Sequence, residues 1–473
     1  MLRAGVHLGG NRTGELEIGR MRRTRLQASG KAGEQIGYTQ RMLPRVGGQQ
    51  LNFGFRQLHG QFRRFHERIL GHFGEKNNVH FIANALPSIF YLRRTAGVTT
   101  LEVPMKRILL AVLLPATPLF ADPVVSPEVQ SDGAVTFRIQ APDAKRVQVI
   151  CEGGTNAMQR DAQGVWTFTS APMEPDIYNY SFSVDGAHVL DAANPLTKYN
   201  LINPESMVHV SGPKSLLWEI NDVPRGQIHR HAYKSRVTKD KDPEKYIVYT
   251  PPGYDPKAKT RYPVLCLLHG QSDDATAWFT AGRANVILDN LIARGQAKPM
   301  IVVAPLSYGT MEILKPGWSL EEDPVSWQRN TDKFVEMLLG EIMPQVERSY
   351  PVSKDRDAHA IAGLSMGATE SLVAGLNHLD RFAWVGSFSA GGLNTNYVAQ
   401  FPALNSKAND KLRLLWIACG KDDPRIDTSK DFCRWLAAEK IRYTWVESPG
   451  EHTYRVWRRD LGDFAPLLFQ GKN

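Results

Sequence analysis

The eight residues AGLSMGAT, positions 362–369, contain the pattern Gly-x-Ser-x-Gly around Ser365. Such a short pattern also occurs by chance, so alone it is only a hypothesis. The preceding HAIAGL predicts a buried strand, and Met366 to Asn377 predict a helix. Ser365 is therefore expected at a strand-to-helix turn, where Gly363 and Gly367 let the backbone reverse and present the serine as a nucleophile. The alternative is a glycine pair that merely lets helix and strand pack closely.

The residues around this turn alternate between apolar runs and helical stretches. The apolar runs are VLCLLHG, MIVVAPL, AIAGLS, AWVGSFSA and LRLLWIACG, and the helical stretches are ANVILDNLIARG, TDKFVEMLLGEIMPQVERSY and DTSKDFCRWLAAEK. Continuous apolar runs suit strands buried on both faces, and their alternation with helices implies crossovers in a mostly parallel sheet. We therefore expect residues 214–473 to form a doubly covered α/β domain, which begins with two leading strands, GQIHRHAYKS and KYIVYTPPGY.

Residues 122–213 show a different pattern, in which short alternating runs are separated by turn residues. The runs are VTFRIQAP, KRVQVICEGG, GVWTFTS, DIYNYSFSVDG and SMVHVSG. Alternation with period two and a turn at Asp185-Gly186 predict a small antiparallel β-sandwich. Trp166 and Tyr178 could contact sugar, but aromatic residues that alternate along a strand more often belong to the core.

The N-terminal part of the sequence carries all of the excess positive charge. Residues 1–104 hold 16 lysines and arginines against 6 acidic residues, and the remaining 369 residues hold 41 against 42. The near-neutral body argues against a nucleic-acid partner, which clustered positive charge would attract. Residues 105–121, MKRILLAVLLPATPLFA, read as a secretory signal that is too short to span a bilayer. We expect translation to begin at Met105 and the product to be exported to the periplasm or medium.

A serine hydroxyl becomes an effective nucleophile beside a base that a carboxylate orients. The strand LRLLWIACG ends in KDDPRID, so Asp422 and Asp423 follow its carboxyl end and Asp427 lies farther on. We assign Asp423 as the acid, because Gly-x-x-Asp sets it just past the strand while Asp422 is expected to point outward. The strand YTWVES is followed by PGEHTY, which places His452 on the next loop. His452 is the only histidine after Asp423, and its alternative role is that of a surface histidine.

Two backbone amides are expected to stabilise the oxyanion that forms during acyl transfer. The amide of Met366 follows the nucleophile directly. The second is assigned to Gln271 in the loop LLHGQSDD, after the strand that we count as the third. His269 in the same loop is expected to tie it to neighbouring backbone rather than to react.

These motifs together resemble the esterase D/feruloyl esterase group of the α/β-hydrolases, which is similar to the enterochelin esterases and the mycolyltransferase fold. The resemblance covers about 240 residues and rests on LLHGQSDDATAWF, ANVILDNLIARGQAKPMIVV, AIAGLSMGATES, VGSFSAG and HTYRVWRRDLGDFAPLLF. It implies a secreted serine carboxylesterase without a cofactor, with Ser365 as nucleophile, Asp423 as acid and His452 as base. Residues 122–213 more weakly resemble Ig-like early-set modules related to family 48 carbohydrate-binding domains.

Three positions depart from the pattern of this group. Gln271 and Glu451 stand where glycine is common, and Ala368 replaces a frequent glycine after the turn. Gln271 could alter the oxyanion loop, and Glu451 brings negative charge next to His452. The departures therefore bear on substrate and rate more than on the class of reaction.

The resemblance favours removal of feruloyl or acetyl groups from plant polysaccharide. The alternatives are a siderophore esterase of the enterochelin type and a non-catalytic glycan-binding protein on a hydrolase scaffold. The segment YGTMEILKPGWSLEEDPVSWQ is expected to form one wall of the pocket, and Trp278, Trp318 and Trp327 either stack on substrate or only pack.

The sequence predicts no metal site, and no disulfide can be assigned from it. His229 and His231 share one face of a strand, but no further ligand accompanies them at metal-binding spacing. The four cysteines lack a metal-type or disulfide-framework spacing, and Cys266 and Cys419 lie in apolar runs where a thiol packs as a small hydrophobic group. The sequence leaves the oligomeric state open.

Overall fold

The computed structural model describes residues 91–95, 98–102, 123–238, 244–315, 317 and 323–471. Contacts divide the chain into two units, Met1–Pro118 and Leu119–Asn473. In the first unit, β1 (Tyr91–Thr95) pairs antiparallel with β2 (Val98–Glu102). The rest of the expected leader over 1–104 and the whole of the expected export signal over 105–121 lie outside the described residues.

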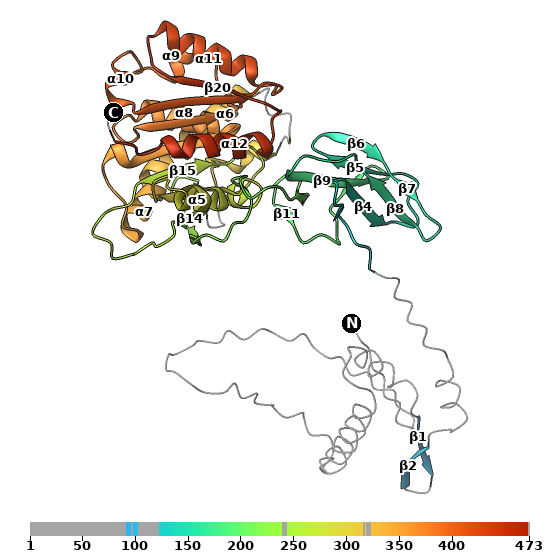
Figure 1. The fold of residues 1–473 in the computed structure, drawn as a ribbon. Helices are drawn as coiled ribbons and strands as arrows, with labels where there is room; N and C mark the ends of the chain where they lie inside the picture. Colours follow the sequence, from blue (N-terminus) through green and yellow to red (C-terminus); the bar gives the residue numbers. More distant parts are fainter. Residues whose placement is uncertain are drawn as a thin grey trace. The chain divides into compact units, whose positions relative to one another are not determined.

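An eight-stranded sheet forms the centre of the larger fold in the second unit (Figure 1). In spatial order its strands are β13 (Gln227–Tyr233), β14 (Glu244–Thr250), β16 (Ile301–Pro305), β15 (Val264–Leu268), β17 (His359–Leu364), β18 (Trp384–Phe388), β19 (Leu414–Gly420) and β20 (Thr444–Ser448). The two leading strands pair antiparallel, and the six strands from β16 to β20 pair parallel. The expected mostly parallel sheet is confirmed.

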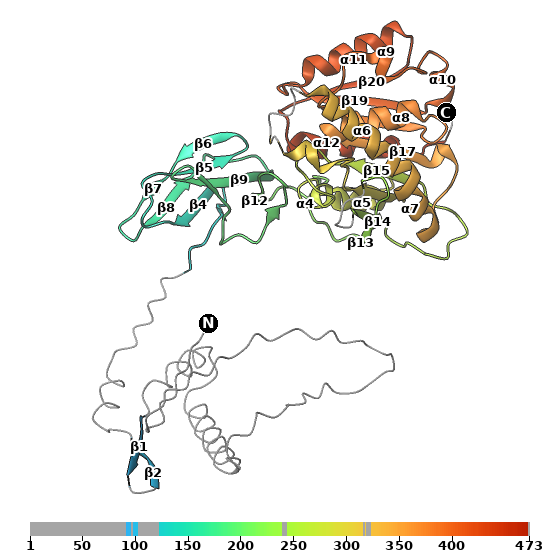
Figure 2. The ribbon, with the colours of Figure 1, turned by 180° about the vertical axis from the view of Figure 1, so that it is seen from behind.

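Helices cover both faces of this sheet, as its continuous apolar strands predict. They are α4 (Ala277–Thr280), α5 (Ala284–Ala293), α6 (Pro324–Met337), α7 (Met343–Ser349), α8 (Met366–Asn377), α9 (Tyr397–Gln400), α10 (Ala408–Lys411), α11 (Ile426–Ala438) and α12 (Tyr454–Phe464), with short 3-10 turns at Met311–Leu314, Arg356–Ala358 and Ala465–Leu467. One apolar core packs α6, α7, α8 and α11 on one face, and a second packs α5 and α12 on the other. Figures 1 and 2 show these faces in turn. None of the described helices is long and apolar enough to cross a membrane.

The helix before the nucleophile turn begins earlier than the sequence pattern indicated. The apolar period predicted a start at Thr331, whereas α6 begins at Pro324. Asp323 caps this helix, because its side chain accepts hydrogen bonds from the amides of Val325 and Ser326, and Pro324 occupies the first turn, where no N–H partner is needed. A π-helical turn at Leu338–Ile342 joins α6 to α7. Residues 324–328, which end the segment expected to form a wall of the pocket, are therefore helical.

Two antiparallel sheets precede the α/β domain. The first has the order β3 (Glu128–Val129), β4 (Val135–Gln140), β8 (Val165–Thr169) and β7 (Gln159–Arg160); the second has the order β11 (Thr197–Lys198), β12 (Glu205–Val210), β9 (Asp176–Val184), β5 (Val147–Cys151) and β6 (Gly154–Ala157), with β10 (Ala187–Val189) paired to β9. Strands of both sheets contribute to one apolar core. We call residues 123–213 the β-region.

The turn at Asp185-Gly186 joins β9 to β10, and both residues have positive φ angles, 49° and 91°. Trp166 and Tyr178 are buried in the core of the β-region, where their polar atoms donate to the backbone carbonyls of Ala141 and Glu174. These two aromatic side chains therefore pack rather than present a surface for sugar.

The β-region packs directly against α12 of the α/β domain. Asp176, at the start of β9, is fully buried and accepts hydrogen bonds from Arg458 at 2.5 Å and Arg459 at 2.7 Å. Ile177 and Met207 of the β-region join the apolar core beneath α5 and α12. Because a buried carboxylate is stable only with such partners, this contact ties the two folds into one packed body.

Candidate active site

Ser365 lies at the turn between β17 and α8. Its backbone has φ 51° and ψ −117°, a strained conformation for a residue with a side chain. A side chain at Gly363 would meet the carbonyl oxygen of Gly367 at 2.4 Å, and one at Gly367 would meet that of His269 at 2.4 Å. Both glycines are therefore required by close backbone contacts, and the serine is left half-buried at the edge of the sheet.

Asp423 and His452 meet at the same edge. Asp423 follows β19, His452 follows β20, and the Nδ1 atom of His452 lies 2.8 Å from Oδ2 of Asp423. Asp423 is 1% exposed, whereas Asp422 is exposed and Asp427 lies at the surface in the first turn of α11. Of the three aspartates considered from the sequence, the structure brings only Asp423 to the histidine.

The surroundings of Asp423 keep its carboxylate ionised. Burial alone would raise its pKa, but the hydrogen bond and charge of His452, the amide of Arg425 and the hydroxyl of Ser389 together lower the pKa below its ordinary value. Trp457 donates in turn to Ser389 Oγ at 3.1 Å. Ser389 was not identified from the sequence, although it follows the run AWVGSF directly.

The His452 ring stands edge-on against Trp457, with ring centroids 4.8 Å apart. Its side chain is 28% exposed, so part of the ring is accessible to solvent. In the described part of the chain, no hydrogen bond joins the Ser365 hydroxyl to this ring. Such contacts are often long before substrate binds and tighten in the reacting complex.

Two backbone amides near Ser365 make no hydrogen bond to another described residue. They are those of Met366, the first residue of α8, and Gln271, which follows Gly270. A side chain at Gly270 would lie 3.2 Å from the Cβ atom of Ser365, so this loop runs directly beside the nucleophile. The Gln271 side chain turns away and donates to the carbonyl of Gly317 at 3.3 Å.

His269 fixes the loop that carries Gln271. Its Nε2 atom accepts from the amide of Ser307 at 3.0 Å, so Nδ1 carries the proton and donates to the carbonyl of Gly270 at 2.8 Å. Burial lowers its pKa, which keeps the ring neutral. His269 therefore ties the loop to neighbouring backbone, as the sequence predicts.

Gly391 closes the other side of the nucleophile. Its amide donates to the carbonyl of Ser365 at 3.0 Å, and a side chain there would approach the Ser365 hydroxyl to 2.9 Å. Trp327 packs against the next residue, Gly392, where a side chain would meet its ring at 2.5 Å. Trp278 is fully buried and donates to Leu268, so it packs only, and Trp318 lies outside the described residues.

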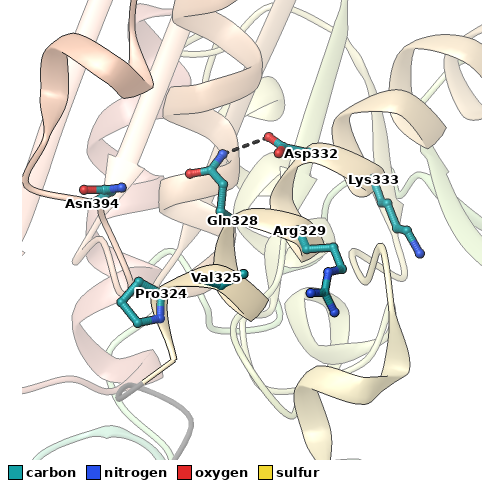
Figure 3. A pocket seen from close by; sticks show the side chains of 7 residues that line it. All are labelled: Pro324, Val325, Gln328, Arg329, Asp332, Lys333 and Asn394. Carbon is teal, nitrogen blue, oxygen red and sulfur yellow. Dashed lines mark hydrogen bonds between the residues drawn. The ribbon is translucent and has the colours of Figure 1, made fainter.

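Two hollows lie along the N-terminal half of α6. The larger, of about 490 Å³, is open, and Figure 3 shows Pro324 and Gln328 of α6 on one side and Asn394 on the other. The smaller, of about 190 Å³, is lined by Trp327 and Gly392 among others. Gly392 directly follows Gly391, the residue that contacts Ser365, whereas Ser365 and His452 are not among the residues that line either hollow.

The structure describes no group of three or more histidine, cysteine, aspartate or glutamate residues that could hold a metal ion. His231 instead bonds the hydroxyl of Tyr350 at 2.6 Å, and His229 that of Thr250 at 3.1 Å. All four cysteines are free thiols, and Cys266 and Cys419 are buried in β15 and β19.

Asp460 of α12 is a second buried carboxylate near this edge. Ser448, the last residue of β20, donates to its Oδ1 atom at 2.5 Å, and its Oδ2 atom has no hydrogen-bond partner in the described structure. Burial raises the pKa of Asp460 to about 7. The folded protein therefore favours the neutral acid.

This shift predicts a loss of stability as the pH rises. The pKa of Asp460 is higher in the folded than in the unfolded protein. Its contribution to the free energy of unfolding is therefore full below about pH 4 and is lost as the pH rises through about 7. We expect wild-type protein to unfold at a lower temperature at pH 8 than at pH 5. In Asp460→Asn, the corresponding difference in the free energy of unfolding should be smaller by about 1 to 3 kcal/mol. Thermal unfolding across this range checks it, with the exposed Asp410→Asn as control. An unchanged pH dependence in Asp460→Asn would contradict it.

Three of the matches to known proteins bear on this site. Residues 241–466 match the family model described as putative esterase. An endo-1,4-beta-xylanase/feruloyl esterase of Xylanibacter ruminicola is 30% identical over 356 residues, which cover 73% of this chain and 46% of that protein. The enterobactin esterase of Shigella flexneri superposes with a TM-score of 0.52 at 20% identity, over 70% of this chain and 92% of its own.

These matches concern the fold and the esterase family model. Residues 241–466 carry the sequence signature of an esterase family on an α/β-hydrolase fold. The chain spans less than half the length of the xylanase/feruloyl esterase. That alignment covers more of the chain than residues 214–473 contain, so it extends into the β-region.

Proposed function

We propose that this chain is a serine carboxylesterase that removes feruloyl or acetyl groups from plant polysaccharide. The observation that carries the proposal is the hydrogen bond between Asp423 and His452, at the sheet edge that also holds the strained Ser365 turn. A match to an esterase family model and 30% identity to a xylanase/feruloyl esterase support the class of reaction and of substrate.

The arrangement supports a two-step acyl transfer. Ser365 attacks the ester carbonyl while His452 takes its proton and passes it to the leaving alcohol; water then cleaves the acyl-enzyme with the same base. Asp423 orients the imidazole and stabilises its protonated form. The amides of Met366 and Gln271 donate to the oxyanion, which exists only during the reaction. Neither step of this acyl transfer uses a cofactor.

We assign the acyl group to the smaller hollow, which Gly392 lines one position after Gly391. At about 190 Å³ it is smaller than typical sites for drug-sized ligands, which start near about 300 Å³, and it suits one acyl group. Trp327 lines it and presents an apolar wall. The sugar would then lie outside this hollow, toward solvent.

A panel of esters tests the substrate class. We expect release of ferulate or acetate from feruloylated xylo-oligosaccharide or acetylated xylan with a kcat/KM at least about tenfold above that for enterobactin, because a mismatched acyl group loses part of its transition-state binding. Ser365→Ala protein serves as the blank. Preference for enterobactin would favour the siderophore esterase, and binding of glycan without cleavage of any ester would favour the glycan-binding protein.

We also propose export, on the basis of the signal-like residues 105–121. We further propose that the β-region is related to Ig-like early-set modules, because its two antiparallel sheets share one apolar core. N-terminal sequencing of secreted protein is expected to give Asp122 as the first residue. A product that retains residues before Met105 would contradict it.

A further inference from the structure

We propose that Lys198 and Asn200 of the β-region are positioning residues for the oxyanion loop, so that the β-region is part of the esterase machinery rather than a separate module. This inference rests on the proposed function. The oxyanion loop is defined here as residues 269–274, between β15 and α4. Lys198 ends β11, Asn200 lies in the turn between β11 and β12, and the residues that they contact follow at least 72 positions later in the chain.

The β-region holds the oxyanion loop through several direct contacts. The amide of Leu201 donates to the carbonyl of Ser272 at 2.6 Å. The side-chain amide of Asn200 donates to Ser272 Oγ at 2.8 Å and to Asp273 Oδ1 at 3.1 Å. Lys198 Nζ lies 3.1 Å from the same Asp273 oxygen. These contacts fix the two residues that directly follow Gln271.

The loop has a conformation that needs such support. Ser272 has a positive φ of 67°, which is unfavourable for a residue with a side chain, and it is fully buried. Strained backbone persists only where surrounding contacts determine it. The bonds from Asn200 and Leu201 reach this residue at its side chain and its carbonyl. They therefore restrain the residue that directly follows Gln271. The amide of Asp273, which Asn200 and Lys198 hold, donates to the carbonyl of Gly270 at 3.3 Å, and this carbonyl belongs to the peptide that carries the Gln271 N–H.

Asp273 also connects this loop to the base. Its Oδ2 atom accepts from the Tyr454 hydroxyl at 2.8 Å, and Tyr454 is the first residue of α12, two positions after His452. Lys198 Nζ also lies 5.5 Å from the centre of the Tyr454 ring. One buried carboxylate thus holds the oxyanion loop, the loop of the base and the β-region together.

Lys198 carries its charge inside this cluster. It is 8% exposed, and burial alone would lower its pKa, but Asp273 and Glu205 raise the pKa above its ordinary value. Asp273 is 4% exposed. A buried ion pair with full hydrogen bonding has a defined geometry, so it suits the positioning of a loop better than an exposed pair.

The test separates turnover from binding. In Asn200→Ala and Lys198→Met we expect kcat on methyl ferulate to fall by about 10- to 100-fold while KM stays within about threefold, because a displaced oxyanion donor acts only in the transition state. Lys198→Arg should recover most of the loss. Methyl ferulate carries no sugar, so a role of the β-region in binding polysaccharide would leave its turnover unchanged.

Two controls match these variants. Tyr199→Ala changes the residue between the two, whose side chain is 62% exposed, and Arg459→Met weakens the contact with Asp176 at a site away from the loop. Both are expected to keep wild-type kcat. Circular dichroism shows whether each variant is folded. If Lys198→Met does not fold, the test of the positioning role rests on Asn200→Ala.

The inference is overturned if folded Asn200→Ala turns over methyl ferulate within twofold of wild type, or if Arg459→Met loses as much kcat as Asn200→Ala. The second result would assign the effect to general loosening between the two folds. Inactive wild-type protein would instead count against the proposed function itself, which keeps the two failures distinct.

Discussion

Replacement of Ser365 by alanine is expected to lower kcat/KM on methyl ferulate by about 10,000- to 1,000,000-fold, while the protein stays folded. The hydroxyl is the atom that forms the acyl-enzyme, and no neighbouring group on the described sheet edge can replace it. The backbone of the turn is set by Gly363, Gly367 and the contact with Gly391, which the substitution leaves in place. Steady-state kinetics with the purified variant measure the loss.

Folding of this variant is checked separately. The Ser365 side chain makes no hydrogen bond in the described residues, so its loss should move the midpoint of thermal unfolding by no more than a few degrees. A folded variant that retains turnover near the wild-type rate would remove Ser365 from the mechanism.

Asp423→Asn is the second substitution with a large expected effect, a fall in kcat of about 1,000- to 10,000-fold. The asparagine keeps the size of the side chain but loses the charge that stabilises protonated His452, and its amide group favours the wrong ring tautomer. The lowered pKa of Asp423 means that the wild-type carboxylate is ionised throughout the neutral range, so the comparison can be made at pH 7.

The neighbouring Asp422 supplies the matched control. It is exposed, and its partner is Lys421 at 4.0 Å at the surface, so Asp422→Asn should keep kcat within about twofold. Equal losses in both variants would point to a general effect of charge at this edge. A larger loss in Asp422→Asn would reverse the assignment made from the Gly-x-x-Asp spacing.

The order of the elements and the sheet edge that carries the site could be predicted from the sequence. Apolar runs and helical periods gave the strands of the central sheet, and α8 spans the predicted Met366–Asn377. These features depend on local sequence, because each strand or helix shows its own period. The start of α6 was missed, although Asp323 and Pro324 are a recognisable start signal.

Contacts between distant parts of the chain could not be predicted. Ser389 reaches Asp423 from the neighbouring strand, and Lys198 reaches Asp273 from the β-region, and neither pair has a spacing that a pattern could reveal. Such pairs depend on the register of β18 beside β19 and on how the two folds pack. The sequence identifies residue types that suit the chemistry, but only the fold shows which of them meet.

Two of the three departures from the family pattern have a structural explanation. Ala368 is fully buried in the core on α8, where its methyl group is accommodated. Glu451 is exposed, so its charge beside His452 is screened by solvent. Gln271 is the one departure of the three that lies in the oxyanion loop. Its side chain donates to the carbonyl of Gly317 and leaves its backbone amide available.

Activation of one serine by the pair of His452 and Asp423 is the central step of the proposed mechanism. Reaction with a fluorophosphonate followed by peptide mass spectrometry tests this directly, since the reagent modifies a serine that an adjacent base activates. We predict one adduct per chain, on the peptide that contains Ser365, and no adduct in Ser365→Ala. Folded wild-type protein that forms no adduct, or forms it on another residue, would contradict the account.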